Sequence, residues 1–300
     1  MEKSIEVFEK EIKIKKARKT IAYIVLYTVL IAFAIIEMFP FLYMILASMR
    51  SKMEMIKFRT EFYLFPKDFD LWGYKQLFSF NPNQFDFLAG LKNTLIFESA
   101  FFFVGIWVDV IVAYGFAKIN CRYRNKIMLF CITCSFLPFV VTLMPHYTMW
   151  SYLGLTGTMW PLVIPHFFGG WGVIFYLERY MKGLSTDIFE AGAIDGLSHM
   201  GRVFYLALPM SMPAIVVQSV FTFLGIWNEI LGPDLYLRSI QDQTLQVMLQ
   251  SLTNAVQQNR ASDQPIIMAG ATLSSLPILA LYLSCQHLFV NSMAATAVKG

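Results

Sequence analysis

Long apolar segments separated by short polar ones dominate the pattern of hydrophobic and polar positions along the chain. Three stretches contain no Asp, Glu, Lys or Arg, namely 127–177, 203–228 and 264–298. An α-helix needs about 20 apolar residues to cross the roughly 30 Å hydrocarbon core of a bilayer. The first stretch is long enough for two crossings joined by a turn at 145–161. The pattern therefore predicts an all-α membrane protein with six transmembrane helices, at about 21–49, 95–117, 127–145, 159–177, 206–230 and 265–288.

Basic residues beside these segments indicate how the chain is oriented. They crowd the end of segment 1–20, follow the second predicted span at Lys118 and Lys126, and return after the fourth at Arg179 and Lys182. Lys and Arg next to spans favour the cytoplasmic side. We therefore expect a cytoplasmic segment 1–20, a membrane domain 21–290 and a cytoplasmic tail 291–300, with both ends inside. Basic residues in the predicted external loop 50–93 conflict with this orientation. The conflict is mild, because long loops follow the rule poorly.

Composition agrees with a membrane protein and argues against other classes. Apolar residues make up 57% of the chain and charged residues 15%, whereas soluble domains are about one-quarter charged. The net charge of +4 is too small to indicate a nucleic-acid partner. The high apolar content instead predicts a lipid bilayer as the surroundings. Cys131 and Cys134 form a CxxC inside an apolar run, where packing is a better interpretation than redox or zinc chemistry. The histidines show no metal-ligand spacing, so we expect no metal site.

A short polar stretch, 184–213, lies between the fourth and fifth predicted spans. Ser185 or Thr186 is suited to begin a helix, and Gly196 is suited to a left-handed helix stop. Ser198 can then cap a second helix that runs toward the next span. We therefore expect a compact helix–turn–helix at the membrane surface, over residues 184–209. Composition alone also allows an ordinary loop between two spans.

The residues of this stretch resemble a known signature, the EAA loop of ATP-binding-cassette importer permeases. The resemblance rests on Glu190-Ala191-Gly192, Asp195-Gly196 and Leu208-Pro209. Gly192 replaces the usual Ala, a small departure that keeps a small side chain. In the family this loop docks into a cleft on a separate ATPase. The resemblance therefore implies that Glu190, Ala191, Gly192, Asp195 and Gly196 form an ATPase-coupling site.

Further motifs resemble the shorter, MalG-like half of carbohydrate importer permeases of the maltose type. They are Trp227-Asn228-Glu229, Leu276-Pro277, the stretch 288–291 and the tail Val298-Lys299-Gly300. In this family the tail reaches between the ATPase subunits. The resemblance implies a multi-pass protein of the bacterial cytoplasmic membrane. It also implies three kinds of partner: a second, homologous permease subunit, two ATP-binding subunits and an extracytoplasmic sugar-binding protein.

Nucleotide chemistry is expected to lie outside this chain. No GxxxxGK[ST] phosphate loop occurs in the sequence, so the chain cannot hold ATP in that way. ATP and Mg would then be bound by the partner ATPase subunits, with no cofactor on this chain. No arrangement of Ser, His and Asp or of paired carboxylates suggests an enzyme.

Four residues are candidates for a substrate path. Trp227, Asn228 and Glu229 place an aromatic face beside hydrogen-bonding groups at the outer end of the fifth span, as a sugar requires. Glu98 lies within the second predicted span, where a charged group costs about 2.5–3.5 kcal/mol and usually faces protein or water. Interfacial anchoring by Trp227 and structural hydrogen bonding by Glu98 remain alternatives.

The leading functional hypothesis is one half of an ATP-driven importer for a sugar, most simply an oligosaccharide. Import of another solute by the same kind of machine is an alternative. A second hypothesis is an ion-coupled carrier that uses Glu98 and Asp109, although the inverted repeats expected of such carriers are not apparent. A membrane enzyme is a third, disfavoured by the absence of a catalytic cluster.

Overall fold

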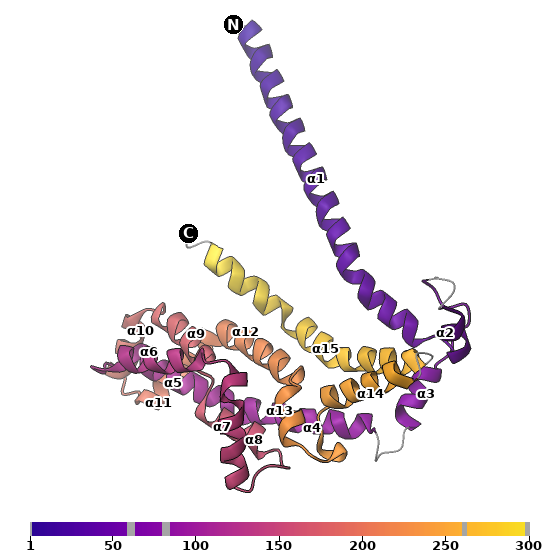
Figure 1. Ribbon diagram of the computed structural model, residues 1–300. Coiled ribbons are helices and arrows are strands. Elements are labelled where there is room, and N and C mark those ends of the chain that lie inside the picture. Colours follow the sequence, from indigo (N-terminus) through magenta and orange to yellow (C-terminus); the bar gives the residue numbers. More distant parts are fainter. Residues whose placement is uncertain (1, 59–63, 80–84, 260–262, 298–300) are drawn as a thin grey trace. The chain divides into compact units, whose positions relative to one another are not determined.

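The computed structural model describes residues 2–58, 64–79, 85–259 and 263–297 (Figure 1). Within these ranges the regular elements are helices, apart from one isolated bridge between Arg50 and Phe69. The all-α prediction is therefore confirmed. The chain packs as two compact units, residues 1–75 with 260–272 and residues 76–259 with 273–300.

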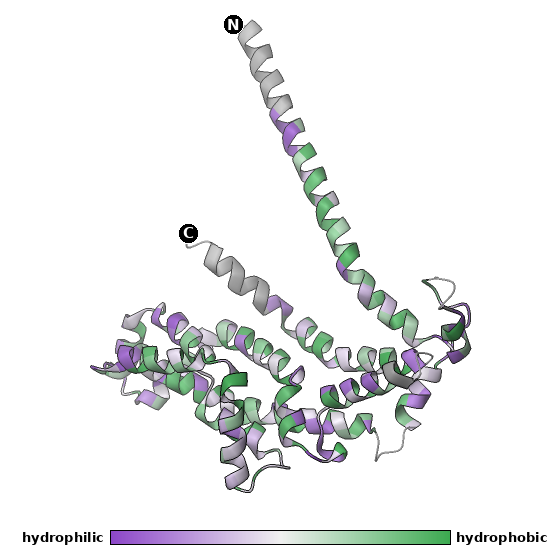
Figure 2. Cartoon of the chain, viewed as in Figure 1, coloured by the Kyte–Doolittle hydropathy of each residue, from purple (hydrophilic) through white to green (hydrophobic). Residues whose placement is uncertain are grey.

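The first unit contains a long N-terminal helix and a loop organised by charged groups. Helix α1 (Glu2–Ser48) changes from polar to apolar near residue 21 (Figure 2). After it, Arg50 is fully buried, lies 4.0 Å from Glu54 and donates to the backbone oxygen of Leu64. Glu54 also accepts a hydrogen bond from the backbone N–H of Lys67. The chain after the first span therefore has a defined structure close to the end of α1.

The elements that follow α1 are helices of very different lengths. Two short helices come first, α2 (Lys52–Phe58) and α3 (Trp72–Ser79). The others are α4 (Phe87–Ala100), the π-helix η1 (Phe101–Gly105), α5 (Ile106–Lys118), α6 (Arg124–Ser135), α7 (Phe139–Tyr152), α8 (Trp160–Val163), η2 (Ile164–Phe168), α9 (Trp171–Lys182), α10 (Thr186–Ile194), α11 (His199–Arg202), η3 (Val203–Ala207), α12 (Leu208–Trp227), α13 (Leu231–Tyr236), η4 (Ile240–Asp242), α14 (Leu245–Asn259) and α15 (Gln264–Ala297).

Most of the predicted spans correspond to helices of suitable length. Within the described residues, five helical stretches are long and apolar enough to cross a membrane. A bent pair, α6 with α7, provides a sixth candidate. The five are Lys15–Ser48, Phe87–Lys118, Trp160–Lys182, His199–Trp227 and Gln264–His287.

The predicted third span, 127–145, is not a single straight helix. Helices α6 and α7 meet at an angle of 92°. Leu137 precedes Pro138, and a proline disfavours the α-helical conformation of the residue before it, so α6 ends here. Pro145, which the sequence analysis placed at the start of a turn, lies inside α7. The turn that follows α7 spans residues 153–159.

The core of the second unit lies where α5 packs against α9. Its central residues are at most 1% exposed, and they are Val110, Ala113, Ile174, Leu177 and Met181. Lipid tails are as apolar as these side chains, so close packing rather than exclusion of water holds such helices together. Ala113, which is small and fully buried, lets the two backbones approach closely.

A buried carboxylate fixes the break before α9. Asp109 on α5 is 1% exposed, and its Oδ1 accepts a hydrogen bond of 2.7 Å from the backbone N–H of Gly170. That N–H would otherwise be unsatisfied, because Gly170 precedes the first residue of α9. Gly169, with φ of +78°, makes the sharp turn out of η2. Asp109 thus joins α5 to the interruption in the fourth span.

Candidate functional site

The polar stretch between the fourth and fifth predicted spans folds as a helix–turn–helix. Ser185 occupies the N-cap position of α10, although its side chain makes no capping hydrogen bond. Gly196 adopts φ of +87°, and its N–H donates to Ala193 O while Leu197 N–H donates to Gly192 O. This pair of bonds is a Schellman helix stop. Ser198 then caps α11 by accepting from the N–H of Gly201.

One side of α10 is anchored to the end of α5. Phe189 is 3% exposed, and its ring packs against that of Tyr114, with 6.1 Å between centroids. The ammonium of Lys118 lies 4.6 Å from the centroid of the same ring and donates a 2.8 Å hydrogen bond to Leu184 O. The start of the helix–turn–helix and its buried aromatic residue are therefore both attached to α5.

The other side of α10 is exposed. Glu190 and Ala191 lie on it, and Ile194 is 86% exposed at its end. Asp195 and Gly196 in the turn are exposed as well. Glu190, Ile194 and Asp195 are therefore all accessible at the surface of the helix–turn–helix.

Gly192 differs from the other residues expected to form the coupling site because it is buried. A Cβ at this position would lie 2.8 Å from Cδ1 of Leu206 and 3.3 Å from Cδ1 of Leu197. The absence of a side chain here therefore makes room for leucines of the same chain. Of the small residues on α10, Ala191 is exposed to an approaching surface and Gly192 is not.

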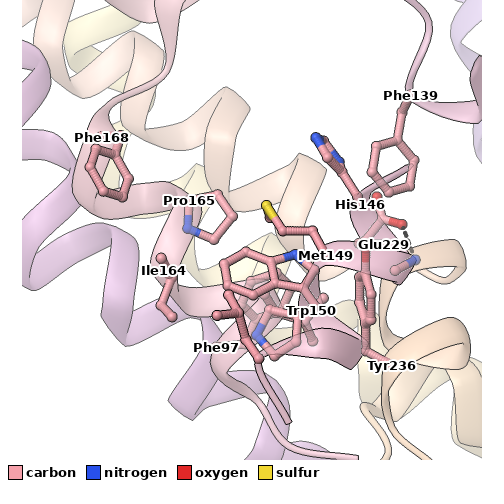
Figure 3. A pocket seen from close by; sticks show the side chains of 14 residues that line it. Phe97, Phe139, His146, Met149, Trp150, Ile164, Pro165, Phe168, Glu229 and Tyr236 are labelled. Atoms are coloured by element: carbon pink, nitrogen blue, oxygen red, sulfur yellow. Dashed lines mark hydrogen bonds between the residues drawn. The ribbon is translucent and has the colours of Figure 1, made fainter. Parts of the chain in front are cut away.

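A cavity of about 740 Å³ lies near the C-terminal end of α12 (Figure 3). Fourteen residues line it, and they come from α4, α7, α8, η2 and α13 and from the residues directly after α7 and directly before α13. Its walls are mainly apolar, and five aromatic rings contribute to them, those of Phe97, Phe139, Trp150, Phe168 and Tyr236. The polar side chains at this site include His146 and Glu229.

Local structure holds the walls of this cavity in place. The N–H of Gly157, in the turn after α7, donates a 2.8 Å hydrogen bond to Tyr236 O on α13. Tyr147 stacks on Tyr236, with 6.2 Å between ring centroids and 14° between ring planes. Burial raises the pKa of the Tyr236 hydroxyl above its ordinary value, so this group stays neutral. Glu229 Oε1 accepts a 2.9 Å hydrogen bond from the N–H of Gly232, which orients its carboxylate.

The four residues predicted for a substrate path do not form one cluster on the cavity. Glu229 lines it. Trp227 is 1% exposed and stacks on Phe223 instead, and Asn228 is exposed with its amide donating to Leu224 O. Glu98 is 3% exposed, and its carboxylate has no hydrogen-bond partner among the described residues.

Two further expectations concern the tail and metals. The tail residues Val298, Lys299 and Gly300, predicted to contact the ATPase, lie outside the described residues. Across the described ranges, no three His, Cys, Asp or Glu side chains are grouped as a metal site would require. The described cysteines are free thiols.

Sequence reasoning did not identify the aromatic walls of the cavity. Trp150 and Tyr236 are separated by 86 positions in the sequence and meet only in the folded chain. The available signal was the concentration of aromatic residues around 145–161, which the sequence analysis interpreted as a turn.

Comparison with known proteins identifies the kind of protein to which this arrangement belongs. The family model described as "Binding-protein-dependent transport system inner membrane component" matches residues 102–295. The chain belongs to this family. The permease is therefore a membrane-embedded transport subunit, as the leading hypothesis predicted.

Two curated relatives match the permease over most of their length. It is 30% identical to Protein LplC of Bacillus subtilis (strain 168), over 88% of this chain and 90% of LplC. It is 27% identical to the arabinooligosaccharides transport system permease protein AraQ of Halalkalibacterium halodurans, over 89% of this chain and 93% of AraQ. The match to LplC supports the same family assignment.

A solved structure shares the fold of the permease. It is the crystal structure of a bacterial ABC transporter involved in the import of the acidic polysaccharide alginate. One of its chains superposes with a TM-score of 0.74 at 21% identity, covering 90% of this chain and 96% of that one. The permease therefore shares its helical architecture with a chain of this transporter.

Proposed function

We propose that this chain is one of two permease halves of an ATP-driven importer of oligosaccharides in the bacterial cytoplasmic membrane. Family membership supports the transport role, and the names of the relatives, which mention arabinooligosaccharides and alginate, support a saccharide as the solute. The single observation that carries the coupling role is the exposed face of α10, presented on a helix–turn–helix that is anchored to α5.

In the proposed assembly the N-terminus, the C-terminus and the helix–turn–helix lie in the cytoplasm. Two ATPase subunits bind ATP and Mg and dock on this chain and on a second, homologous permease half. An extracytoplasmic binding protein delivers the sugar. Glu190 and Ala191 meet the ATPase surface together with Asp195 and Gly196, while Gly192 supports the turn from inside. The tail residues Val298, Lys299 and Gly300 contact the ATPase subunits.

The contacts within the second unit suggest how a movement of α10 reaches the membrane helices. When the ATPase subunits close on ATP, they displace α10. Phe189 passes this displacement to Tyr114 and Lys118 on α5, because the three side chains are packed together. Helix α5 is packed along α9, and so α5 and α9 move with the docked helix. Hydrolysis reverses the displacement.

The same proposal places the sugar path at the far end of α12 from the helix–turn–helix. Glu229 faces the path directly because it lines the aromatic cavity. Trp227 and Glu98 are buried, so in this proposal they support the surrounding helices rather than face the sugar, and Asn228 is the residue that ends α12.

Substitution of Glu190 in the complete importer tests the coupling role. We expect Glu190→Ala and Glu190→Arg to lower substrate-stimulated ATP hydrolysis in vesicles by about tenfold or more, because a paired charge at an interface is lost or reversed. The matched control is Asp242→Ala, which removes a carboxylate from η4. Unchanged substrate-stimulated hydrolysis in both Glu190 variants contradicts the proposal.

A further inference from the structure

We propose that the cavity beside Glu229 is a subsite for an uncharged sugar unit of the imported saccharide and that it disfavours uronic-acid units. This inference rests on the proposed function and narrows its substrate class. It follows from the walls of the cavity, from the charges that line it and from its position in the unit (Figure 3).

The walls suit the apolar faces of a sugar ring. The volume of about 740 Å³ lies in the range of sites that hold small molecules. Trp150 comes from α7, Tyr236 from α13 and Phe97 from α4, so that rings approach the cavity from three helices. The C–H faces of a pyranose or furanose stack on such rings, because the face of an aromatic ring is electron-rich and attracts polarised C–H groups.

The polar groups match a small number of hydroxyls. The carboxylate of Glu229 is held by the N–H of Gly232 through Oε1, which leaves Oε2 able to accept from a sugar hydroxyl. The imidazole of His146 also lines the cavity. A path must bind its substrate strongly enough for entry and weakly enough for release. Few polar partners on a mainly apolar wall that carries aromatic rings satisfy both demands.

The charges that line the cavity disfavour an acidic unit. Among the described lining residues, none is Lys or Arg. The guanidinium of Arg238 donates to the hydroxyl of Tyr147, which stacks on Tyr236, and Arg238 itself is not part of the lining. A uronate here would bring a second carboxylate close to Glu229, with no Lys or Arg among the described lining residues to compensate. Like charges repel strongly where aromatic walls replace water.

The position of the cavity suits a subsite on a path across the membrane. Residues 199–227 form one helical stretch, which is about 1.5 Å long per residue. The α10–α11 turn precedes this stretch, and the segment carrying Glu229 follows it (Figure 1). The subsite and the coupling site therefore lie at opposite ends of the same span, so a displaced α12 connects them.

Direct binding to the complete importer, without the binding protein, tests this inference. The probes are the neutral trisaccharides arabinotriose, cellotriose and maltotriose and the acidic trigalacturonate, titrated calorimetrically against the complex in nanodiscs. We expect at least one neutral probe to bind more tightly than trigalacturonate. Trp150→Ala should raise the Kd of that probe about tenfold, because a stacking surface is lost. The matched control Trp160→Ala, at a tryptophan that does not line the cavity, should leave it unchanged.

A second variant tests the charge argument. Glu229→Gln keeps an oxygen for the N–H of Gly232 but removes the charge. The ratio of the Kd of trigalacturonate to the Kd of the neutral probe should therefore fall about tenfold. Three results overturn the inference: tighter binding of trigalacturonate to the wild-type complex, no binding of a neutral probe, or a neutral-probe Kd that Trp150→Ala does not change. Substrate-stimulated ATPase and its response to the Glu190 substitutions, measured on the same preparations, report separately on the proposed function.

Discussion

Gly192 and Gly196 lie four residues apart in the helix–turn–helix, and a side chain at each would meet a different constraint. Gly196 has φ of +87°, a conformation that costs other residues roughly 1–2 kcal/mol. Gly192 has ordinary helical geometry but is covered by Leu206 and Leu197. Because Leu206 approaches with the far end of a flexible side chain, an alanine at 192 fits after a small shift. This explains how the Ala usual in related loops and the Gly found here occupy the same place.

Lys118, at the end of α5, contacts the helix–turn–helix twice, through Leu184 O and through the ring of Phe189 on α10. We expect Lys118→Met to raise the ATP hydrolysed per sugar transported roughly fivefold, because both the hydrogen bond to Leu184 O and the cation over the Phe189 ring are lost. Lys118→Arg keeps a cation and should retain most of the coupling. The measurement is ATPase activity and uptake on the same vesicles.

Lys126→Met is the matched control for this prediction, since it removes an exposed lysine from α6. A hydrolysis-to-uptake ratio that is the same in Lys118→Met and in Lys126→Met would show that Lys118 does not transmit the movement of α10.

At the scale of elements, the spans are interrupted rather than continuous. The second contains the π-helix η1, the third bends between α6 and α7, the fourth breaks at Gly169-Gly170, and the fifth begins with the π-helix η3. Such interruptions are frequent at functional positions in helices. Asp109 on α5 bridges two of the interrupted spans, because its carboxylate accepts from the N–H of Gly170 at the break before α9.

Asp109 allows the role of one break to be tested. Asp109→Leu leaves the N–H of Gly170 without this acceptor, and we expect it to destabilise the complex by about 1 kcal/mol, as the loss of one part-buried hydrogen bond does. Asp109→Asn keeps a side-chain oxygen for the same bond and should be close to the wild type. Thermal unfolding of the purified complex measures both. Equal melting temperatures for the Leu and Asn variants would show that the bond does not hold the break.

The sequence predicted some of these elements well and others poorly, for physical reasons. Five spans were found because an apolar run of sufficient length is itself the requirement for crossing a bilayer. The turn at Gly196 was found because its conformation favours one residue type. The bend at 136–138 was missed because the apolar stretch 127–177 contains no charge to mark it. The cavity was missed because its rings come from segments far apart in the chain.

At the scale of the whole molecule, the exposed apolar surface indicates what the chain needs around it. In the most apolar window of α1 only 6% of the residues are buried within the chain. Exposed apolar side chains also occur on α7, at Val140, Val141 and Met144. Surfaces of this kind are stable against lipid tails or against another membrane subunit. In the proposed assembly, a second permease half and the bilayer together provide such surroundings.

In the proposed assembly the α10–α11 turn lies in the cytoplasm and docks the ATPase. The most direct test places a single cysteine at Ile194, with serine at the four native cysteine positions 121, 131, 134 and 285, and uses a membrane-impermeant maleimide. The side chain at 194 is 86% exposed in this chain, so it should be labelled in inside-out vesicles that contain the permease halves alone. Binding of the ATPase subunits should protect it. Labelling from outside intact cells, or equal labelling with and without the ATPase, would contradict the account.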